Sequence, residues 1–270
     1  MTSSPALAAR CEMARAILTE AAALALSHFA QVATLAVEAK ANGQDVVSIA
    51  DREVEQLVRR RVTQAFPGDG FLGEEYGAAP ARSDFLWVLD PIDGTSCFVH
   101  GLRSWCIALA LVEHGRTVAG FVLDPNADEL FAAMAGAGAT LNGRPIGVDA
   151  RTDLRRGLTS VGASFRVPAG TSAAVIERLI AAGGMFVRNG SGALSLAYVA
   201  CGRLAAYYEP HMNAWDCLAG LLLIREAGGW TQDFPMDGDL ARGGPVTGCA
   251  PQLREDLLAV IAAAQIEAAA

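Results

Sequence analysis

The sequence has no CxxC pair and no cysteine and histidine residues with the spacing of a zinc site. Its six cysteines are scattered along the chain, at Cys11, Cys97, Cys106, Cys201, Cys217 and Cys249. Disulfide frameworks belong mainly to secreted proteins, and we expect no secretory leader here, so we interpret all six as reduced thiols. We therefore expect a cytoplasmic protein that folds without disulfides.

The sequence also lacks an uninterrupted apolar run of the roughly 18 to 20 residues that a membrane span requires. Its alanine-rich N-terminal stretch is interrupted by ionisable residues, at Arg10, Glu12, Arg15, Glu20 and His28. This pattern predicts an amphipathic helix rather than a membrane span.

Basic residues are comparatively few, with 21 Lys and Arg against 29 Asp and Glu, and the formal net charge is -8. Nucleic acids and anionic membranes are bound by clustered Lys and Arg, so we expect neither as a partner. The expected partner is a small molecule or a cation. An acidic protein can still bind an anionic substrate when a bound divalent metal reverses the local charge of the site.

The sequence contains no internal repeat, and its 270 residues predict one large domain or two packed lobes. In the first half, we predict one long helix over residues 5–40 and a second helix over 51–66 that ends at a Pro-Gly pair. Four runs of strand character follow and are typical of an antiparallel meander. These runs cover residues 85–89, 106–112, 118–123 and 129–134.

After about residue 150, segments of strand and helix character alternate, which indicates α/β layering. The predicted strands cover residues 157–162, 185–188 and 204–208, and the predicted helices cover 172–182, 192–201 and 214–227; short strands and a last helix after Pro251 follow. We expect two parts: residues 1–150, with two helices and then an antiparallel sheet, and residues 151–270, with the α/β pattern. The boundary is predicted near residues 145–155.

The most informative stretch is WVLDPIDGT, in which an apolar strand ends in two acids, Asp90 and Asp93. The intervening proline restricts Asp90 to extended geometry, and Gly94 lets the backbone approach a ligand closely. The two carboxylates can then point into one pocket, while the amides of Gly94 and Thr95 face an anion. Asp-Pro and Asp-Gly pairs also occur in ordinary turns. However, two like charges beside a buried edge are costly unless a cation pairs them, and Mg²⁺ is the first choice among hard divalent ions.

Other acidic positions have ordinary explanations when they are taken singly. Glu74 lies in a Gly-Glu-Glu segment that is typical of a solvated turn. Asp51, with Glu55 one helical turn later, is typical of the start of a helix. Asp216, after Trp215, could simply cap the N-terminus of an apolar helix.

Taken together and in this order, these residues resemble the inositol monophosphatase family. The matching segments are Asp51-x-x-x-Glu55, Gly73-Glu74-Glu75, Asp90-Pro91-Ile92-Asp93-Gly94-Thr95, Trp215-Asp216 and Glu226-Ala227-Gly228-Gly229. Further matches are Phe98-Val99-His100-Gly101, Gly138-Ala139-x-Leu141-Asn142-Gly143 and Ala200-x-Gly202-Arg203, so the resemblance covers nearly the whole chain. It implies an α+β fold, a layered αβαβα sandwich, in a homodimeric Mg²⁺-dependent phosphomonoesterase.

The resemblance also implies a set of metal ligands. Glu74, Asp90 and the carbonyl of Ile92 would hold a first Mg²⁺, and Asp90, Asp93 and Asp216 would hold a second. Glu74 would also contact a third, weaker ion. Two neighbouring cations can lower the pKa of a water molecule, orient it for attack and stabilise the departing alkoxide.

The resemblance further assigns catalytic and substrate-binding residues. Asp51 and Thr95 resemble the family's water-activating pair, with Glu74 beside them, and the amides of Gly94 and Thr95 would bind phosphate oxygens. Positions that would contact the substrate are Gly190, Ser191, Gly192, Glu209 and Asp216. A carboxylate suits a polyol, since it accepts hydrogen bonds from two hydroxyl groups at once.

The sequence departs from the family around the pocket rim, at Ser96-Cys97, Ala205-Ala206 and Pro210-His211. The substrate therefore stays open between inositol monophosphate or a similar polyol phosphate, histidinol phosphate, a nucleotide 3′-phosphate and fructose bisphosphate. A non-catalytic regulator that keeps the fold and binds another protein is an alternative of a different class. The complete set of metal ligands favours the enzyme, because a pure binding protein has no use for it.

Overall fold

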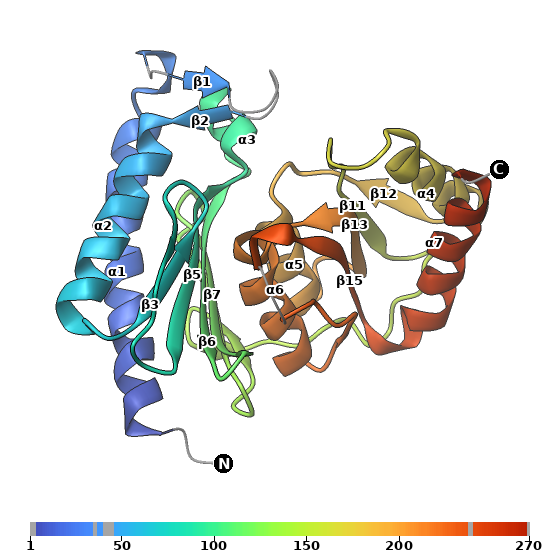
Figure 1. Cartoon of the computed structure of the whole chain (residues 1–270). Helices are drawn as coiled ribbons and strands as arrows, with labels where there is room; N and C mark the ends of the chain where they lie inside the picture. The colour runs from blue at the N-terminus through green and yellow to red at the C-terminus, as the bar shows by residue number, and fades with distance from the viewer. Residues whose placement is uncertain (1–3, 35–36, 40–45, 237–239, 269–270) are drawn as a thin grey trace.

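The computed structural model describes residues 4–34, 37–39, 46–236 and 240–268. In these residues, helices and sheets alternate in five layers (Figure 1). The helical layers are α1 (Pro5–Phe29) with α2 (Ile49–Ala65), α5 (Gly192–Ala200) with α6 (Ala214–Glu226), and α4 (Gly170–Ala181) with α7 (Arg254–Ala268). An eight-stranded sheet separates the first two helical layers and a five-stranded sheet the last two, so the predicted α+β fold, a layered αβαβα sandwich, is confirmed.

The larger sheet has the strand order β10-β9-β8-β7-β6-β5-β3-β4. Its strands are β3 (Gly70–Gly73), β4 (Gly77–Ala79), β5 (Phe85–Asp93), β6 (Cys106–Glu113), β7 (Arg116–Asp124), β8 (Glu129–Met134), β9 (Ala139–Leu141) and β10 (Arg144–Pro145). The strands from β5 to β10 are antiparallel neighbours, as the meander predicts, whereas β3 pairs parallel to β5. The prediction omits β3, β4, β9 and β10, because two to four residues are too few for a periodic pattern.

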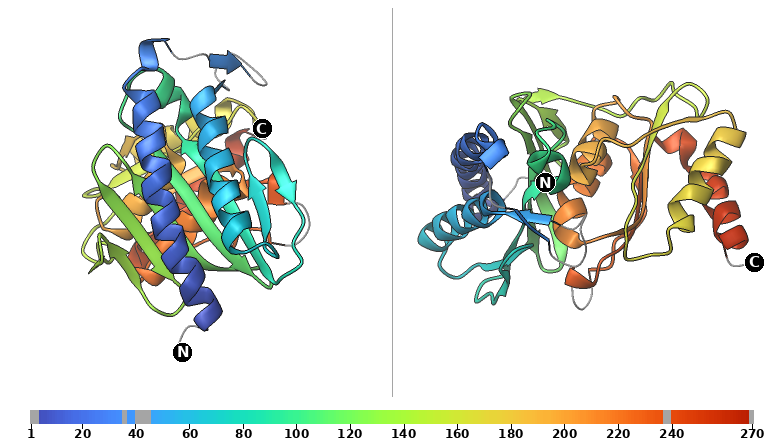
Figure 2. Two further views of the ribbon diagram at one scale, coloured as in Figure 1. Left: turned by 90° about the vertical axis from the view of Figure 1, so that its left-hand side faces the viewer. Right: turned by 90° about the horizontal axis from the view of Figure 1, so that it is seen from above.

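Both faces of this sheet are covered, and Figure 2 shows α1 and α2 side by side across one of them. Along β6, Ile107 packs in the core on the α1–α2 side, whereas Ala108 and Ala110 pack in the core on the α5–α6 side. Small residues let α6 come close: a Cβ at Gly120 of β7 would lie 2.7 Å from the carbonyl oxygen of Ala219. Burial on both faces explains why these strands are continuous apolar runs.

The predicted helix over residues 5–40 is wrong beyond α1. After Phe29 the chain turns and forms β1 (Val37–Ala39), which pairs antiparallel with β2 (Val46–Ser48). Phe29, the last residue of α1, still packs against the core beside Phe98 and Trp105, and β-branched residues, which disfavour a helix, follow it. Part of the predicted range lies outside the described residues.

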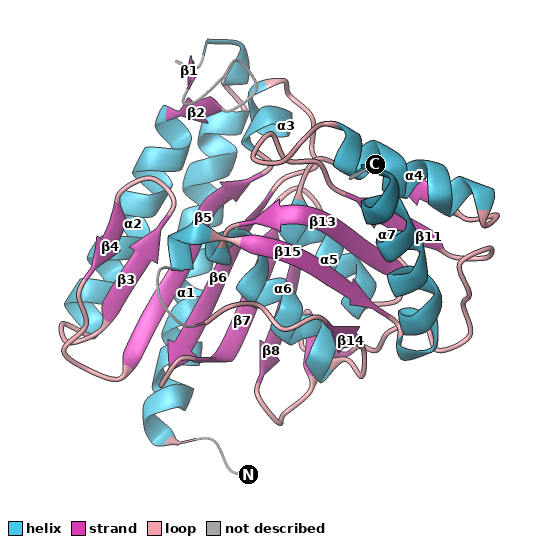
Figure 3. Ribbon diagram, turned by 45° about the vertical axis from the view of Figure 1, so that its right-hand side comes forward, coloured by secondary structure: helices cyan, strands magenta, loops and turns pink. Residues whose placement is uncertain are grey.

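The smaller sheet has the order β12-β11-β13-β15-β14 and is mixed. Its strands are β11 (Leu158–Val161), β12 (Met185–Val187), β13 (Ala206–Met212), β14 (Trp230–Thr231) and β15 (Gly244–Cys249). β11, β12 and β13 are parallel, while β15 is antiparallel to both of its neighbours. Figure 3 shows α5 and α6 between this sheet and the larger one, in the alternation predicted after residue 150. The division of the chain at about that residue stays a prediction.

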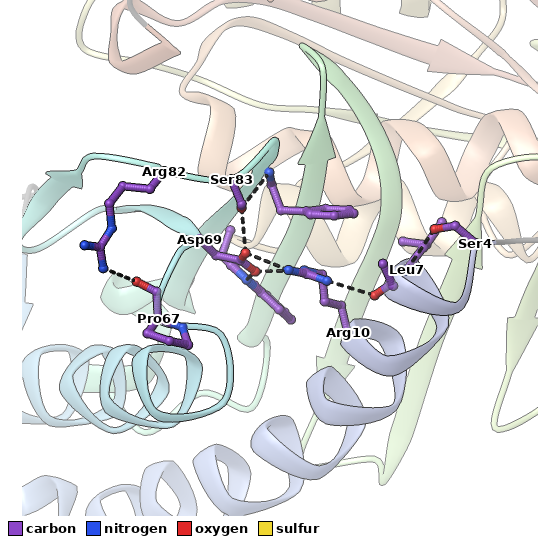
Figure 4. Close-up of polar contacts among 10 residues, drawn as sticks. Ser4, Leu7, Arg10, Pro67, Asp69, Arg82 and Ser83 are labelled. Carbon is purple, nitrogen blue, oxygen red and sulfur yellow. Dashed lines mark hydrogen bonds and ion pairs between the residues drawn. The ribbon is translucent and has the colours of Figure 1, made fainter.

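The start of β3 is anchored to α1 by a cluster of hydrogen bonds around Asp69 (Figure 4). The Arg10 guanidinium donates to both Asp69 carboxylate oxygens, at 2.8 and 2.7 Å. The Ser83 hydroxyl and the Trp87 indole N–H donate to the same carboxylate at 2.7 and 2.9 Å. Burial by itself raises the pKa of Asp69, but these donors outweigh it and leave the pKa below its ordinary value.

The remaining elements are the short helix α3 (Thr95–Val99) and three 3-10 turns, η1 (Val32–Thr34), η2 (Leu240–Arg242) and η3 (Pro251–Leu253). Within the described residues, no helix combines the length and the apolarity that crossing a membrane requires.

Candidate metal centre

β5 ends in two buried carboxylates. Asp90 still pairs with Ala108 of β6, but the register shifts between Asp90 and Asp93, where Pro91 has no N–H to continue the ladder. The Ile92 amide donates to Asp90 Oδ1 at 2.9 Å. Such a bulge re-aims side chains, and here it holds both acids at one end of the sheet.

Glu74, Asp90 and Asp216 converge from three distant segments of the chain. Glu74 follows β3, the parallel neighbour of β5, and Asp216 lies in the first turn of α6. One carboxylate oxygen from each lies within 4.8 Å of those from the other two. Asp216 is oriented by a capping box, in which its Oδ2 accepts the Asn213 amide at 2.9 Å.

The chemistry of this donor set fits a divalent cation. Burial, then the charges of Glu74 and Asp93, raise the pKa of Asp90 well above its ordinary value. Burial and the same two charges also raise the pKa of Asp216. A bound cation relieves both the burial cost and the repulsion, and carboxylate oxygens are the ligands that Mg²⁺ prefers.

Asp93 is held mainly by the backbone and side chains at the start of α5. Its Oδ2 accepts the Ala193 amide at 2.7 Å and a hydrogen bond from the Ser191 hydroxyl. Cys106 Sγ lies 3.8 Å from the same oxygen. Burial raises the pKa of Asp93 to about 6, although these hydrogen bonds oppose the shift. Asp93 therefore lies beside the group of three acids, with one oxygen already engaged.

Asp51 and Thr95, predicted as a pair, are in direct contact. The Thr95 hydroxyl lies 3.0 Å from Asp51 Oδ1 and 3.0 Å from the Ile92 carbonyl oxygen. Asp51 Oδ2 accepts the amide and the hydroxyl of Ser48 at 2.8 and 2.6 Å. Burial raises the pKa of Asp51 to about 6 against these hydrogen bonds. The pair thus forms an oriented hydroxyl and carboxylate next to the acidic cluster.

Two adjoining hollows contain these groups. The first hollow, of about 180 Å³, is lined by Glu74, Asp90, Ile92, Asp93, Gly94, Thr95, Gly190 and Asp216. The second hollow, of about 170 Å³, is lined by Asp93, Gly190, Ser191, Gly192, Glu209 and Asp216. Asp93, Gly190 and Asp216 border both, so all the predicted site residues except Asp51 line these adjoining hollows, and Asp51 reaches them through Thr95.

Glycines make room in this pocket. Gly94 has a φ of +97°, in the left-handed region, and a Cβ there would lie 2.8 Å from the Ser104 carbonyl oxygen. A Cβ at Gly190 would lie 2.3 Å from Cys97 Sγ. Cys97, one of the departures from the family, therefore packs against the loop that lines both hollows.

Glu209, at the second hollow, accepts a hydrogen bond from the Tyr207 hydroxyl. Burial raises the pKa of Glu209 to about 7, and the charge of Asp93 adds to this, whereas Arg188 and Arg166 oppose it. The hydroxyl of Ser191, a predicted substrate-binding residue, is already hydrogen-bonded within the protein. Its hydroxyl binds Asp93 and accepts the Leu194 amide at 3.2 Å, so it caps α5.

Sequence reasoning missed several polar residues that line the two hollows, among them Arg166 in the first hollow, and Arg188 and Asn189 in the second. Asn189 Oδ1 accepts the Ser191 amide at 3.1 Å and so shapes the loop before α5. A signal was available for Arg188 and Asn189, because they follow a strand of a parallel set, whose carboxyl ends meet at one edge. Arg166 lies in a loop without such a pattern.

Similarity to known proteins extends over most of the chain. The model of the inositol monophosphatase family matches residues 7–266. An inositol-1-monophosphatase from Mesorhizobium japonicum is 39% identical over 221 residues, 81% of this chain and 83% of that protein. A Nus factor SuhB from Xylella fastidiosa is 40% identical over 211 residues, 77% of this chain and 76% of that protein. The crystal structure of extragenic suppressor protein suhB from Bartonella henselae is 31% identical, with a TM-score of 0.87 over 94% of this chain and 98% of that chain.

Proposed function

The chain belongs to the inositol monophosphatase family, and from this premise we propose that it is a Mg²⁺-dependent phosphomonoesterase that hydrolyses a small phosphorylated polyol, with inositol monophosphate as the first candidate. The observation that carries the proposal is the convergence of Glu74, Asp90 and Asp216 beside the Asp51–Thr95 pair. In the reaction, a water oxygen bonds to phosphorus, the bond from phosphorus to the alcohol oxygen breaks, and the alcohol leaves with a proton.

In this proposal, Glu74, Asp90 and the Ile92 carbonyl would hold one Mg²⁺, and Asp90, Asp93 and Asp216 would hold a second. Glu74 would also contact a third, weaker ion. Bound Mg²⁺ supplies positive charge to the phosphate oxygens and lowers the pKa of a nearby water molecule. The chain's own contribution is to hold the ligands in place: the Ile92 amide fixes Asp90, and the Ala193 amide fixes Asp93.

Asp51 and Thr95 move the proton. The Thr95 hydroxyl donates to Asp51 Oδ1, so Thr95 Oγ1 can accept a proton from the attacking water as its own proton passes to the carboxylate. Asp51 suits this task, because burial brings its pKa to about 6, which is near the working pH of a cytoplasmic enzyme. The two hydrogen bonds from Ser48 keep the acceptor oxygen pointed at the threonine.

The second hollow receives the alcohol part of the substrate. Glu209 accepts hydrogen bonds from substrate hydroxyls, and Gly190 and Gly192 leave room for the ring. Ser191 shapes this wall through its bond to Asp93, and Asp216, which borders both hollows, would contact both the second Mg²⁺ and the substrate. The amides of Gly94 and Thr95 bind phosphate oxygens from the first hollow.

Phosphate release from a panel of esters, with Mg²⁺ and with a chelator, tests the activity and ranks the substrates. The panel contains inositol monophosphate, histidinol phosphate, a nucleotide 3′-phosphate and fructose bisphosphate. Asp93→Asn is expected to abolish Mg²⁺-dependent turnover and to leave the fold intact. Failure of the wild type on every ester would count against the enzyme. The homodimer and the cytoplasmic location also stay predictions, which sedimentation and cell fractionation can test.

A second candidate is a regulator that binds another protein without catalysis. It is favoured by one observation: the Xylella relative is named a Nus factor rather than a phosphatase. Retention of a regulatory phenotype by Asp93→Asn, with no phosphatase activity in the wild type, would support this candidate.

A further inference from the structure

Glu74 is supported differently from the two acids that it meets. Asp90 lies on a strand and Asp216 on a helix, whereas Glu74 lies in the turn between β3 and β4, near the outer edge of the larger sheet. Its own amide donates to the Leu89 carbonyl oxygen at 3.3 Å. The position of its carboxylate therefore depends on how the rest of this turn is held.

The turn is held by a carboxylate from α2. Glu55 is fully buried, and its Oε2 accepts the Glu75 amide at 2.8 Å, while its Oε1 accepts the Tyr76 amide at 3.1 Å. These are the two amides that directly follow Glu74. Gly73 gives the space, because a Cβ there would lie 2.2 Å from Glu55 Oε1.

Arg59 completes the arrangement. Its Nε donates to Glu55 Oε1 at 2.7 Å, and its guanidinium also donates to the Gly77 carbonyl oxygen, on the far side of the turn. The guanidinium lies 4.4 Å from the centre of the Phe71 ring. The buried charge of Glu55 is therefore paired. Together, Glu55 and Arg59 hydrogen-bond to the backbone on both sides of the turn.

We propose that Glu55 and Arg59 are positioning residues for Mg²⁺: they fix the turn so that the Glu74 carboxylate is preorganised to bind the ion. The proposal rests on the proposed function. It assigns α2 two tasks one helical turn apart, since Asp51 of the same helix binds Thr95 and Glu55 binds the Glu74 turn. Residues that orient metal ligands commonly change metal affinity when they are replaced.

The test is calorimetric titration of Mg²⁺ into chelator-treated full-length protein. Glu55→Gln keeps the shape but turns one acceptor end into an NH₂ group, which cannot accept an amide. We expect its Mg²⁺ dissociation constant to rise about tenfold or more. With saturating Mg²⁺, we expect kcat to return to within about threefold of wild type, because ligands and catalytic pair are all present.

A second variant tests the same contact without removing a hydrogen-bonding group. Gly73→Ala adds a methyl group into the space that the Glu55 carboxylate occupies, so its Mg²⁺ affinity should fall in the same direction. If Glu55→Gln does not fold, the Mg²⁺ affinity of Gly73→Ala still tests the proposal.

Two controls on α2 separate positioning from general destabilisation. Glu53→Gln makes the same chemical change at a residue that binds His28, and it should leave Mg²⁺ affinity unchanged. Val58→Ala loosens the buried face of α2 without touching the turn. The proposal is overturned if both test variants bind Mg²⁺ like the wild type, or if Val58→Ala at equal loss of thermal stability weakens Mg²⁺ binding equally. Absence of Mg²⁺ binding by the wild type would instead overturn the metal centre itself.

Discussion

The two ends of β3 carry acids in opposite surroundings. At its start, Asp69 is bound by Arg10, Ser83 and Trp87, and its pKa lies below the ordinary value. Beyond its other end, Glu74 meets Asp90 and Asp216, and there burial and the charge of Glu74 raise the pKa of Asp90 and of Asp216. The first acid is neutralised by an arginine of the chain, whereas Asp90 and Asp216 lie among like charges. Backbone amides bind Asp90 and Asp216 as well, so hydrogen-bond donors alone do not distinguish the two ends of β3. The feature that indicates a cation site is a raised pKa among several neighbouring acids.

Removing one negative charge from the cluster of Glu74, Asp90 and Asp216 should have the largest effect on activity. Asp90→Asn removes a ligand shared by both predicted ions, so we expect Mg²⁺-dependent turnover to fall by about a thousandfold or more, since metal charge contributes several kcal/mol to the transition state. In a chelator, the same variant should unfold at a temperature equal to or above that of the wild type, because repulsion in the cluster is reduced. Phosphate release and thermal unfolding measure the two effects. If the variant is less stable than the wild type in the chelator, the chain itself must already stabilise the charge of Asp90 without metal.

The pH dependence of stability without metal should show the same contrast. Folding raises the pKa of Asp51 and of Asp93 from 3.8 to about 6, so between these values the folded protein binds more protons than the unfolded chain. In a chelator, this contribution to stability is present below about pH 4 and is lost as the pH rises to about 6 or 7, on the order of 3 kcal/mol for each of the two acids. Saturating Mg²⁺ should remove much of this loss, because it favours the charged carboxylates. Urea unfolding at several pH values, with and without Mg²⁺, measures it, and identical curves would contradict the assignment.

The opposite end of β3 offers the complementary change. Asp69→Asn weakens a charged pair and leaves its donors less well satisfied, so we expect a loss of about 1 to 2 kcal/mol in the free energy of unfolding. Because Asp69 lies outside both hollows, Mg²⁺ affinity and kcat should stay within about twofold of wild type. Denaturant unfolding and calorimetry give the two readings. A large loss of Mg²⁺ affinity would mean that the two ends of the strand are coupled.

The sequence predicted which acids would converge better than it predicted the contacts that support them, for a physical reason. Asp90, Asp93 and Thr95 lie within six residues, so their chemistry is local, and Asp216 follows the recognisable start of a helix. Glu55 acts on the backbone of residues that lie 20 and 21 positions later, and a backbone amide leaves no mark in a sequence. The same holds for β3 and β4, whose short strands are stabilised by pairing rather than by their own pattern.

A substitution at Glu209, in the wall of the second hollow, should have the smallest effect of the four. It also tests whether the second hollow acts separately from the first. Glu209→Gln keeps the size of the side chain but leaves one acceptor oxygen instead of two, so a polyol loses part of one hydrogen bond. We expect KM for inositol monophosphate to rise about three- to tenfold, a change of roughly 1 kcal/mol, with the Mg²⁺ dissociation constant unchanged. Phenyl phosphate has neither a hydroxyl nor an ammonium group to donate to Glu209, so its KM should barely change and provides the matched control. If both esters lose affinity equally, or if Mg²⁺ binding weakens, Glu209 acts through Asp93 and the first hollow rather than on the alcohol. Such an effect has a physical route, because the charge of Asp93 already contributes to the raised pKa of Glu209.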